Sequence, residues 1–414
     1  MPGKRILVVG AGAAGMMAAG TAAQNGAQVV VLERNARTGR KLMITGKGRC
    51  NVTNDCDVRD FIAAVPANGN FLFSAASRFS PHDTMAFFES CGLALKTERG
   101  RRVFPQSDKA SDVVETMTRF LRQTGCNIVH GRAQALLLEN GRVQGVRTED
   151  GKVLSGDCVI IACGGLSYPR TGSTGDGYRL ARAAGHTITP LGPSLVPLMS
   201  SDAFCPELQG LTLKNIAIKV IDQEQKKERY KDFGELLFTH FGLSGPVILS
   251  ASAHMRPMRK GRYTVYIDLK PALSEEQLQK RLLRDFQENK NKAFLNALHG
   301  LLPKAMIPVV VARSGILQHT KCNGVTRQQR MGFSSLLKNF AVQIEGFRPV
   351  EEAIITAGGV HVKEIDPKTM QSRLVKGLYF AGEVIDVDAY TGGYNLQIAF
   401  STGYLAGVSA AVLP

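Results

Sequence analysis

The 414-residue sequence predicts an α/β fold whose two halves are separated by a large insertion. Three observations support this prediction. The first fifty residues alternate short apolar strands with an Ala-rich helix, the last sixty return to apolar strands beside glycines, and the composition changes near Pro190. We therefore expect a core domain built from residues 1–190 and 351–414, and an inserted substrate domain at 191–350.

A glycine-rich turn joins the first expected strand, Arg5–Val9, to the first helix. The turn is a GxGxxG motif at residues 10–15, and a second strand, Val29–Leu32, runs up to Glu33. Such glycines allow a tight turn, close approach of a pyrophosphate and close helix packing, and the helix N-terminus attracts phosphates. An acid 23 positions after Gly10 suits the ribose hydroxyls and argues against a 2′-phosphate. This order predicts a Rossmann-like dinucleotide-binding domain, with contacts from Gly10, Gly12, Ala13, Ala14, Gly15, Glu33 and Arg34.

The uncharged stretch Ile6–Ala23 has a second interpretation, as a membrane span or signal peptide. Its four glycines and small residues make a poor membrane helix, so we expect no membrane association and a cytoplasmic protein. The eight cysteines contain no CxxC pair, which disfavours zinc, an iron–sulfur cluster and a redox-active disulfide. We expect no metal site.

The loop at residues 39–54 contains three further glycines and four cations. A loop this long, basic and glycine-rich suggests backbone folded against a large cofactor. The stretch resembles the signature of the YhiN/BaiN-like (RdsA-type) flavoproteins, whose cofactor is FAD. The resemblance implies a two-dinucleotide-binding-type FAD domain, with cofactor contacts from Arg40, Lys41, Gly48, Arg49 and Asn51.

Further segments carry the same resemblance. Asn127–Leu138 and Arg142–Thr148 are expected to form a hairpin around Asn140-Gly141, placing backbone of Ala133 near adenine. A buried strand at Cys158–Ala162 leads to a Gly pair, and a small-residue helix is expected at Ile398–Ala411. By resemblance, its N-terminus points at the flavin pyrimidine ring. The cofactor contacts implied here are Gly164, Gly382, Glu383, Gly393, Asn395 and Leu396.

The net charge of +16 and the pI near 9.6 favour a polyanionic partner, with nucleic acid first and an anionic membrane surface second. The expected insertion is β-rich with a helical block at about 274–340. It holds 23 Lys and Arg against 13 Asp and Glu, a net charge of +10. Its dense basic runs lie at 226–231 and 256–262. If this insertion binds RNA, we expect charge reversal at Arg259, Lys260 and Arg262 to flatten the slope of log affinity against log salt concentration.

No second GxGxxG precedes a strand and an acid, so NAD(P)H, if it is the donor, must visit the flavin through the substrate pocket. Family members act on a uridine of 23S ribosomal RNA, giving dihydrouridine, or on a bile-acid enone. Both reactions add a hydride from flavin N5 and a proton to a C=C bond conjugated to a carbonyl. The basic insertion favours ribosomal RNA as substrate. The alternatives are the steroid enone and a flavin-containing RNA-binding assembly factor without activity.

The proton requires a donor, because carbon protonation is slow without a placed acid. Cys50 is the first candidate, since it follows Lys47 and Arg49 in the loop expected to cover the flavin. Those cations also favour thiolate, which would weaken the acid. His240, in an insertion motif that resembles a second family signature, is the next candidate, and Tyr394 follows.

Overall fold

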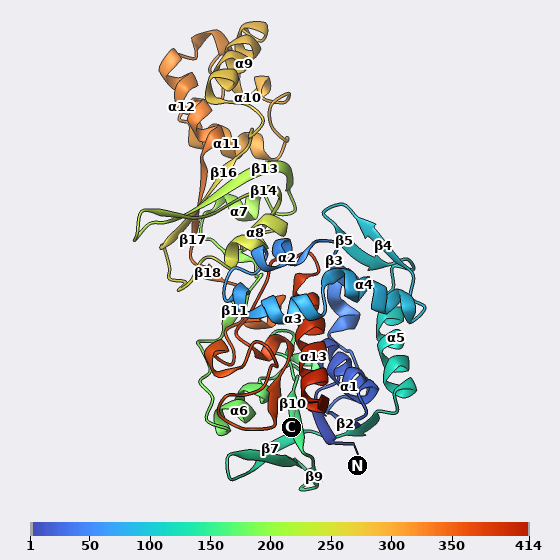
Figure 1. The fold of residues 1–414 in the computed structure, drawn as a ribbon. Helices are drawn as coiled ribbons and strands as arrows, with labels where there is room; N and C mark the ends of the chain where they lie inside the picture. The colour runs from blue at the N-terminus through green and yellow to red at the C-terminus, as the bar shows by residue number, and fades with distance from the viewer. Residues whose placement is uncertain (1–2, 413–414) are drawn as a thin grey trace. The chain divides into compact units, whose positions relative to one another are not determined.

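The computed structural model describes residues 3–412, which form two compact units (Figure 1). The first unit contains residues 1–194 and 349–414, and the second contains residues 195–348. Each unit has its own hydrophobic core.

A five-stranded parallel sheet forms the centre of the first unit, in the order β20-β10-β1-β2-β6. The inner strands β1 and β10 are near-continuous runs of buried apolar residues, as expected for strands covered on both faces, whereas the edge strand β6 is largely exposed. The strands are β1 (Arg5–Val9), β2 (Gln28–Glu33), β6 (Asn127–His130), β10 (Cys158–Ile161) and β20 (Leu378–Phe380).

Two helices of small residues, α1 (Ala13–Gln24) and α13 (Tyr394–Val412), pack against each other. A Cβ at Gly403 would lie 2.4 Å from the Ala14 carbonyl oxygen, and one at Gly407 would lie 2.4 Å from the Ala18 oxygen. Both glycines are therefore required by the close approach of the two helices. Helix α13 begins at Tyr394, four residues before the expected start.

Smaller elements of the first unit surround the parallel sheet. Its other strands are β3 (Thr53–Asn54), β4 (Leu95–Glu98), β5 (Arg102–Pro105), β7 (Ala133–Glu139), β8 (Arg142–Thr148), β9 (Val153–Ser155), β11 (Gly192–Ser194) and β19 (Ile355–Ala357). They form the sheets β3-β5-β4, β7-β8-β9 and β11-β19. Its other helices are α2 (Val58–Ala63), α3 (Phe73–Arg78), α4 (Pro81–Ser90), α5 (Ala110–Gln123) and α6 (Asp176–Ala183).

The expected continuous strand Asn127–Leu138 was wrong. Strand β6 pairs with β2 in the parallel sheet, and only β7 forms the hairpin with β8. The chain leaves the sheet at Gly131, whose N–H donates to the Glu33 carbonyl oxygen at 2.9 Å. The next side chain, Arg132, turns to an ion pair instead of continuing the strand.

The second unit is built on a seven-stranded antiparallel sheet, in the order β17-β16-β13-β14-β15-β12-β18. Its strands are β12 (Leu198–Met199), β13 (Thr212–Asp222), β14 (Lys227–Thr239), β15 (Gly242–Ser244), β16 (Tyr263–Asp268), β17 (Phe340–Ile344) and β18 (Gly346–Phe347). Its helices are α7 (Phe204–Glu207), α8 (Pro246–Ser252), α9 (Glu275–Glu288), α10 (Phe294–Ala297), α11 (Met306–Ser314) and α12 (Arg327–Lys338).

The uncharged N-terminal stretch is divided between β1 and α1. Among residues 3–412, no helix has the length and apolar character needed to cross a membrane.

Candidate cofactor and substrate site

Three glycines shape the turn between β1 and α1. A Cβ at Gly15 would lie 1.8 Å from the Gly10 carbonyl oxygen, and Gly10 has a φ of +104°, so the protein's own packing requires both. Gly12 differs, because a Cβ there would meet no described atom within 4 Å. No side chain caps α1 at Gly12, which leaves the first-turn N–H groups, including those of Ala13 and Ala14, without a side-chain acceptor. The turn thus presents a helix N-terminus with room for phosphates.

Glu33 lies at the carboxyl end of β2 and is buried. One carboxylate oxygen accepts the Ala11 N–H at 2.7 Å, and the other accepts the backbone and side-chain N–H groups of Asn35, both at 2.7 Å. These bonds fasten the glycine turn to the loop after β2. A carboxylate has about four acceptor positions, so one remains for a ribose hydroxyl.

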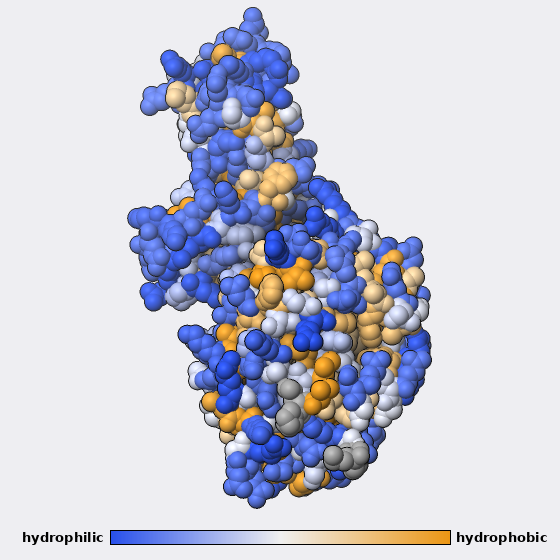
Figure 2. All heavy atoms as spheres, in the orientation of Figure 1, coloured by the Kyte–Doolittle hydropathy of each residue, from blue (hydrophilic) through white to orange (hydrophobic). Residues whose placement is uncertain are grey.

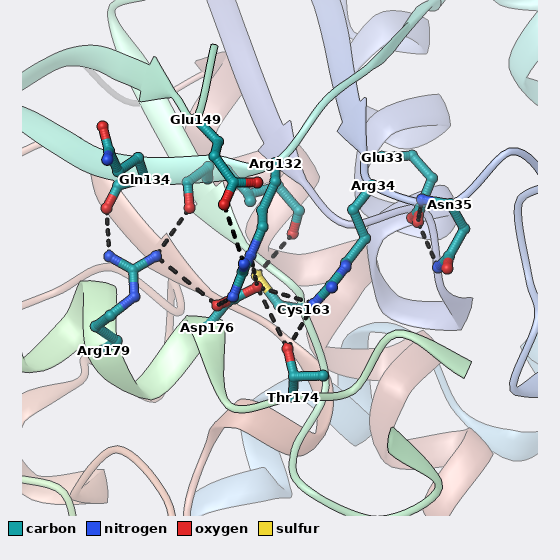
Figure 3. A network of polar contacts seen from close by, with 12 residues as sticks. Glu33, Arg34, Asn35, Arg132, Gln134, Glu149, Cys163, Thr174, Asp176 and Arg179 are labelled. Carbon is teal, nitrogen blue, oxygen red and sulfur yellow. Dashed lines mark hydrogen bonds and ion pairs between the residues drawn. The ribbon is translucent and has the colours of Figure 1, made fainter. Parts of the chain in front are cut away.

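A cluster of three arginines surrounds Asp176 at the start of α6 (Figure 3). Arg132 donates two hydrogen bonds to its carboxylate at 2.7 and 2.9 Å, Arg34 donates one at 3.2 Å, and Arg179 lies 3.8 Å away. Burial raises the pKa of Asp176, but Arg132, Arg34 and Arg179 together hold it below its ordinary value. Arg34 is therefore positioned by α6 beside the end of β2. Arg179 also donates to the Ala133 carbonyl oxygen at 2.9 Å, so this oxygen, expected near adenine, already has a partner.

Lys41 joins four segments of the first unit. Its Nζ donates to Glu383 and to Ser167, each at 2.6 Å. Glu383 also accepts the Thr356 N–H at 2.9 Å and the Ser167 hydroxyl at 3.0 Å. The basic loop, the loop after β10, strand β19 and the end of β20 thereby meet at one partly buried charge pair. Arg40, next to Lys41, is exposed and donates to the Asn35 side chain at 3.0 Å.

The second half of the basic loop is held in a different way. Arg49 pairs with Glu98 and Asp108, and its guanidinium lies 4.1 Å from the centroid of the Phe104 ring. Gly48 has a φ of +84°, which provides the turn before Arg49. The buried Oδ1 of Asn51 has no hydrogen-bond partner within residues 3–412. An unpartnered buried acceptor is costly, so Asn51 is a natural position for a ligand donor.

The glycines of the last segment bring other elements close to the N-terminus of α13. A Cβ at Gly382 would lie 2.8 Å from the Ala14 Cβ, and one at Gly393 would lie 2.3 Å from the Thr53 carbonyl oxygen. Asn395 binds the Ala389 backbone through both side-chain atoms, at 2.8 and 2.9 Å, so its amide shapes the loop before α13. Leu396 is half-buried. Gly164 has a φ of +74°, and a Cβ there would lie 2.9 Å from the Ser173 hydroxyl oxygen. Both the backbone conformation and the close packing at this position therefore favour glycine.

These features fit an FAD cofactor in the first unit. The uncapped turn at Gly12 would hold the pyrophosphate, Glu33 the ribose, and the free Oδ1 of Asn51 a donor of the isoalloxazine ring. Lys41 and Glu383 would hold the surrounding loops in place.

Cys50 does not meet the requirements of a proton donor. Burial raises its pKa to about 12, so the thiol stays protonated, but its side chain has no exposed surface through which it could reach a substrate. The expectation that Arg49 favours its thiolate was wrong, because Arg49 is engaged by Glu98 and Asp108. A donor must reach the substrate, so Cys50 instead packs in the core.

The other two candidates are accessible. Tyr394 is half-buried at the first position of α13, and its ring centroid lies 6.5 Å from that of Phe61. Burial is the main cause that raises the pKa of its phenol, and the nearby Cys56 and Asp60 raise it further. His240 is exposed in the turn between β14 and β15 of the second unit.

Sequence reasoning missed the roles of Asp176 and Arg132. The signals were present, since Asp176 ends a glycine-rich loop at the start of a helix and Arg132 follows Gly131 at the end of a strand. Their pairing spans 44 residues, and no local pattern reports it.

Comparison with known proteins places the whole chain in one context. A family model described as the HI0933-like protein Rossmann domain matches residues 4–409. The chain is 34% identical over 419 residues to a 3-dehydro-bile acid delta(4,6)-reductase of Clostridium scindens, covering 99% of this chain and 100% of that protein. It is 30% identical over 398 residues to a ribosomal RNA dihydrouridine synthase of Escherichia coli, covering 96% of each.

Among solved structures, the 3-ketosteroid delta1-dehydrogenase of Sterolibacterium denitrificans has a TM-score of 0.53 at 13% identity, with both chains fully covered. At this identity the likeness concerns the fold alone.

Proposed function

This chain belongs to the HI0933-like family and is an FAD-dependent oxidoreductase, and from this premise we propose that it reduces a uridine of large-subunit ribosomal RNA to dihydrouridine. The two relatives reduce different substrates, and identities of 34% and 30% do not separate them. The observation that carries the choice is the charge of the second unit, with 23 Lys and Arg against 13 Asp and Glu. A steroid does not require that excess, whereas RNA phosphates do.

The residues of the first unit have separable tasks in this reaction. Bound FAD, once reduced by the hydride donor, would supply a hydride to the β carbon of the conjugated C=C bond. The glycine turn and α1 bind its pyrophosphate, and the Lys41–Glu383 pair holds the loops around it. The N-terminus of α13 carries a partial positive charge, which favours negative charge on a nearby carbonyl.

The α carbon needs a proton, and Tyr394 now replaces Cys50 as the first candidate donor. It lies in the cofactor-binding unit, and its raised pKa keeps the phenol protonated at neutral pH. His240 remains the second candidate. NAD(P)H is the proposed reductant, reaching the flavin through the substrate entrance because the chain has no second GxGxxG unit.

The steroid-reductase alternative is supported by the 34% identical relative, and the non-catalytic alternative by the basic charge alone. Anaerobic reoxidation separates the three. We expect the reduced protein to be reoxidised by large-subunit ribosomal RNA from a strain lacking the gene, and not by a 3-oxo bile-acid diene. Reoxidation by the bile acid alone would identify a steroid reductase, and RNA binding without reoxidation would identify an assembly factor.

A further inference from the structure

One segment of the second unit contains basic residues and no acid. Between Glu288 and Glu345 lie 56 residues with eight Lys and Arg and not one Asp or Glu. We call residues 289–344 the acid-free segment. It includes α10, α11, α12 and β17, and it does not overlap either dense basic run at 226–231 or 256–262.

Packing of the acid-free segment leaves six of its eight basic side chains exposed. Phe294 and Phe333 are fully buried with ring centroids 5.1 Å apart, and Phe294 also meets Phe286 of α9 at 5.8 Å. With apolar residues in the interior, most of the cations lie at the surface, whereas Lys338 is largely buried and pairs with Asp268 at 2.6 Å. Figure 2 shows mainly hydrophilic residues over the region of α9–α12. The exposed bases are Lys290, Lys292, Lys304, Arg313, Lys321 and Arg327.

Three of these bases lie on two chain segments that are hydrogen-bonded to each other. The Cys322 N–H donates to the Lys292 carbonyl oxygen at 3.0 Å, and the Asn323 N–H donates to the Lys290 oxygen at 3.2 Å. Residues 293 and 321 also form an isolated β-bridge. We call Lys290, Lys292 and Lys321 the lysine triplet. Within the described part of the chain, none of its ammonium groups lies within 4.0 Å of a carboxylate.

The nearest helix, α9, contributes little neutralising charge, because three of its four acids, Glu276, Asp285 and Glu288, are paired with bases of α9 itself. Arg281 pairs with Asp285 at 2.7 Å, Arg284 approaches Glu288 at 3.9 Å, and Lys280 pairs with Glu276 at 2.6 Å.

The basic run at 256–262 behaves differently. The side chain of Arg262 is 5% exposed and bound to Asp222 at 2.9 Å, Arg259 pairs with Glu224 at 3.6 Å, and Lys260 pairs with Glu345 at 3.0 Å. The expectation that Arg262 forms part of an RNA surface was therefore wrong, since its charge is used inside the unit.

We propose, resting on the RNA substrate proposed above, that the acid-free segment binds the phosphate backbone of folded ribosomal RNA and that the lysine triplet is the centre of this contact. Unpaired, exposed ammonium groups release counterions from RNA phosphates on binding, which gives affinity without reading the sequence. The flavin unit then acts on a uridine delivered by this anchoring.

The test uses the full-length flavoprotein with the triple substitution Lys290→Glu, Lys292→Glu and Lys321→Glu. A matched control carries Lys260→Glu, Lys280→Glu and Arg284→Glu, three exposed bases of the same unit that already have carboxylate partners and undergo the same charge change. Binding of large-subunit ribosomal RNA is measured against salt concentration. We expect the slope of log affinity against log salt to fall by about two to three in the triplet variant, and by less in the control.

Two further readouts separate this proposal from the reaction itself. Melting temperature and flavin content should match wild type, since the substituted side chains are exposed. If the wild-type protein forms no dihydrouridine but the triplet variant still shows a smaller salt dependence of RNA binding, the proposed reaction is wrong and the proposed RNA-binding surface is supported. An unchanged slope in the triplet variant, an equal loss in the control, or a triplet-dependent binding to phosphatidylglycerol vesicles in place of RNA would each overturn the proposal.

Discussion

Two basic stretches of the second unit look alike in sequence and differ in what their charges contact. In the run at 256–262, Arg259, Lys260 and Arg262 each have a carboxylate partner. In the acid-free segment, the lysine triplet has none among the described residues. The density of cations along a chain therefore does not measure the charge available to a partner. What matters is whether the fold brings acids to them.

The basic loop of the first unit resembles the run at 256–262, because two of its cations are also paired with carboxylates. They are Lys41 and Arg49, which sequence reasoning assigned to a large cofactor. In the structure Lys41 binds Glu383 and Arg49 binds Glu98 and Asp108. Their proposed role is accordingly to hold the cofactor site in shape, while the cations of the lysine triplet are exposed.

The largest effect is expected where a buried pair is broken. Asp222→Asn removes a fully buried carboxylate that binds both Arg262 and Arg229. Arg262 would remain buried with only the more distant Glu224, at 3.4 Å, as a carboxylate partner, so we expect the melting temperature to fall on the order of 5–10 °C, with the salt slope of RNA binding unchanged. A stable variant with a weaker slope would show that this cluster faces RNA after all.

The same carboxylate predicts a pH dependence. Hydrogen bonds from Arg262, above all, lower the pKa of Asp222. Its stabilising contribution is then present above the unfolded-state pKa of about 3.9 and is lost as the pH falls from there through the folded-state pKa. Wild type should lose more stability than Asp222→Asn in acid melts below about pH 4. An equal loss of stability in acid by the wild-type protein and Asp222→Asn would contradict the assignment of this pH dependence to Asp222.

The next effect concerns the cofactor. Lys41→Met removes a charge-assisted hydrogen bond of about 1.5–3 kcal/mol that holds Glu383 and Ser167. We expect FAD to bind roughly ten to a hundred times more weakly, as followed by flavin fluorescence on dilution, with RNA affinity retained. Glu383→Gln should behave similarly. Lys47→Met changes an exposed lysine of the same loop and serves as the control.

A smaller effect is expected from the exposed ion pairs of the 256–262 run. Arg259 and Lys260 are 66% and 79% exposed, and such pairs contribute at most about 1 kcal/mol. Replacing both by Gln should change the free energy of unfolding by less than that, and should leave the RNA slope within error. A loss of slope equal to that of the triplet variant would remove the distinction between the two stretches.

The smallest effect is expected at Cys50. With no exposed surface and a pKa of about 12, its thiol should resist alkylation by iodoacetamide at pH 8 in the native protein. Peptide mass spectrometry before and after unfolding measures this directly. Rapid native alkylation would restore Cys50 as a candidate donor.

Local patterns were sufficient for strands β1, β2 and β10 of the central sheet and for its glycine turn, but not for β6. The first fifty residues follow a fixed spacing of strand, glycine motif, helix, strand and acid. The sequence alone therefore predicts β1, the GxGxxG turn, β2 and Glu33. Pairs distant in sequence have no such signature. Lys41 meets Glu383 across 342 positions, and Arg262 meets Asp222 across 40, so their charges could not be assigned in advance. The break at Gly131 depends on the same kind of contact.

Dihydrouridine mapping of large-subunit ribosomal RNA tests the central claim most directly. RNA from a strain lacking the gene is compared with RNA from the same strain carrying either the wild-type gene or the lysine-triplet variant. We expect one dihydrouridine to disappear on deletion, to return with the wild-type gene, and to return only in part with the triplet variant. An unchanged dihydrouridine pattern in the deletion strain would contradict the proposed reaction.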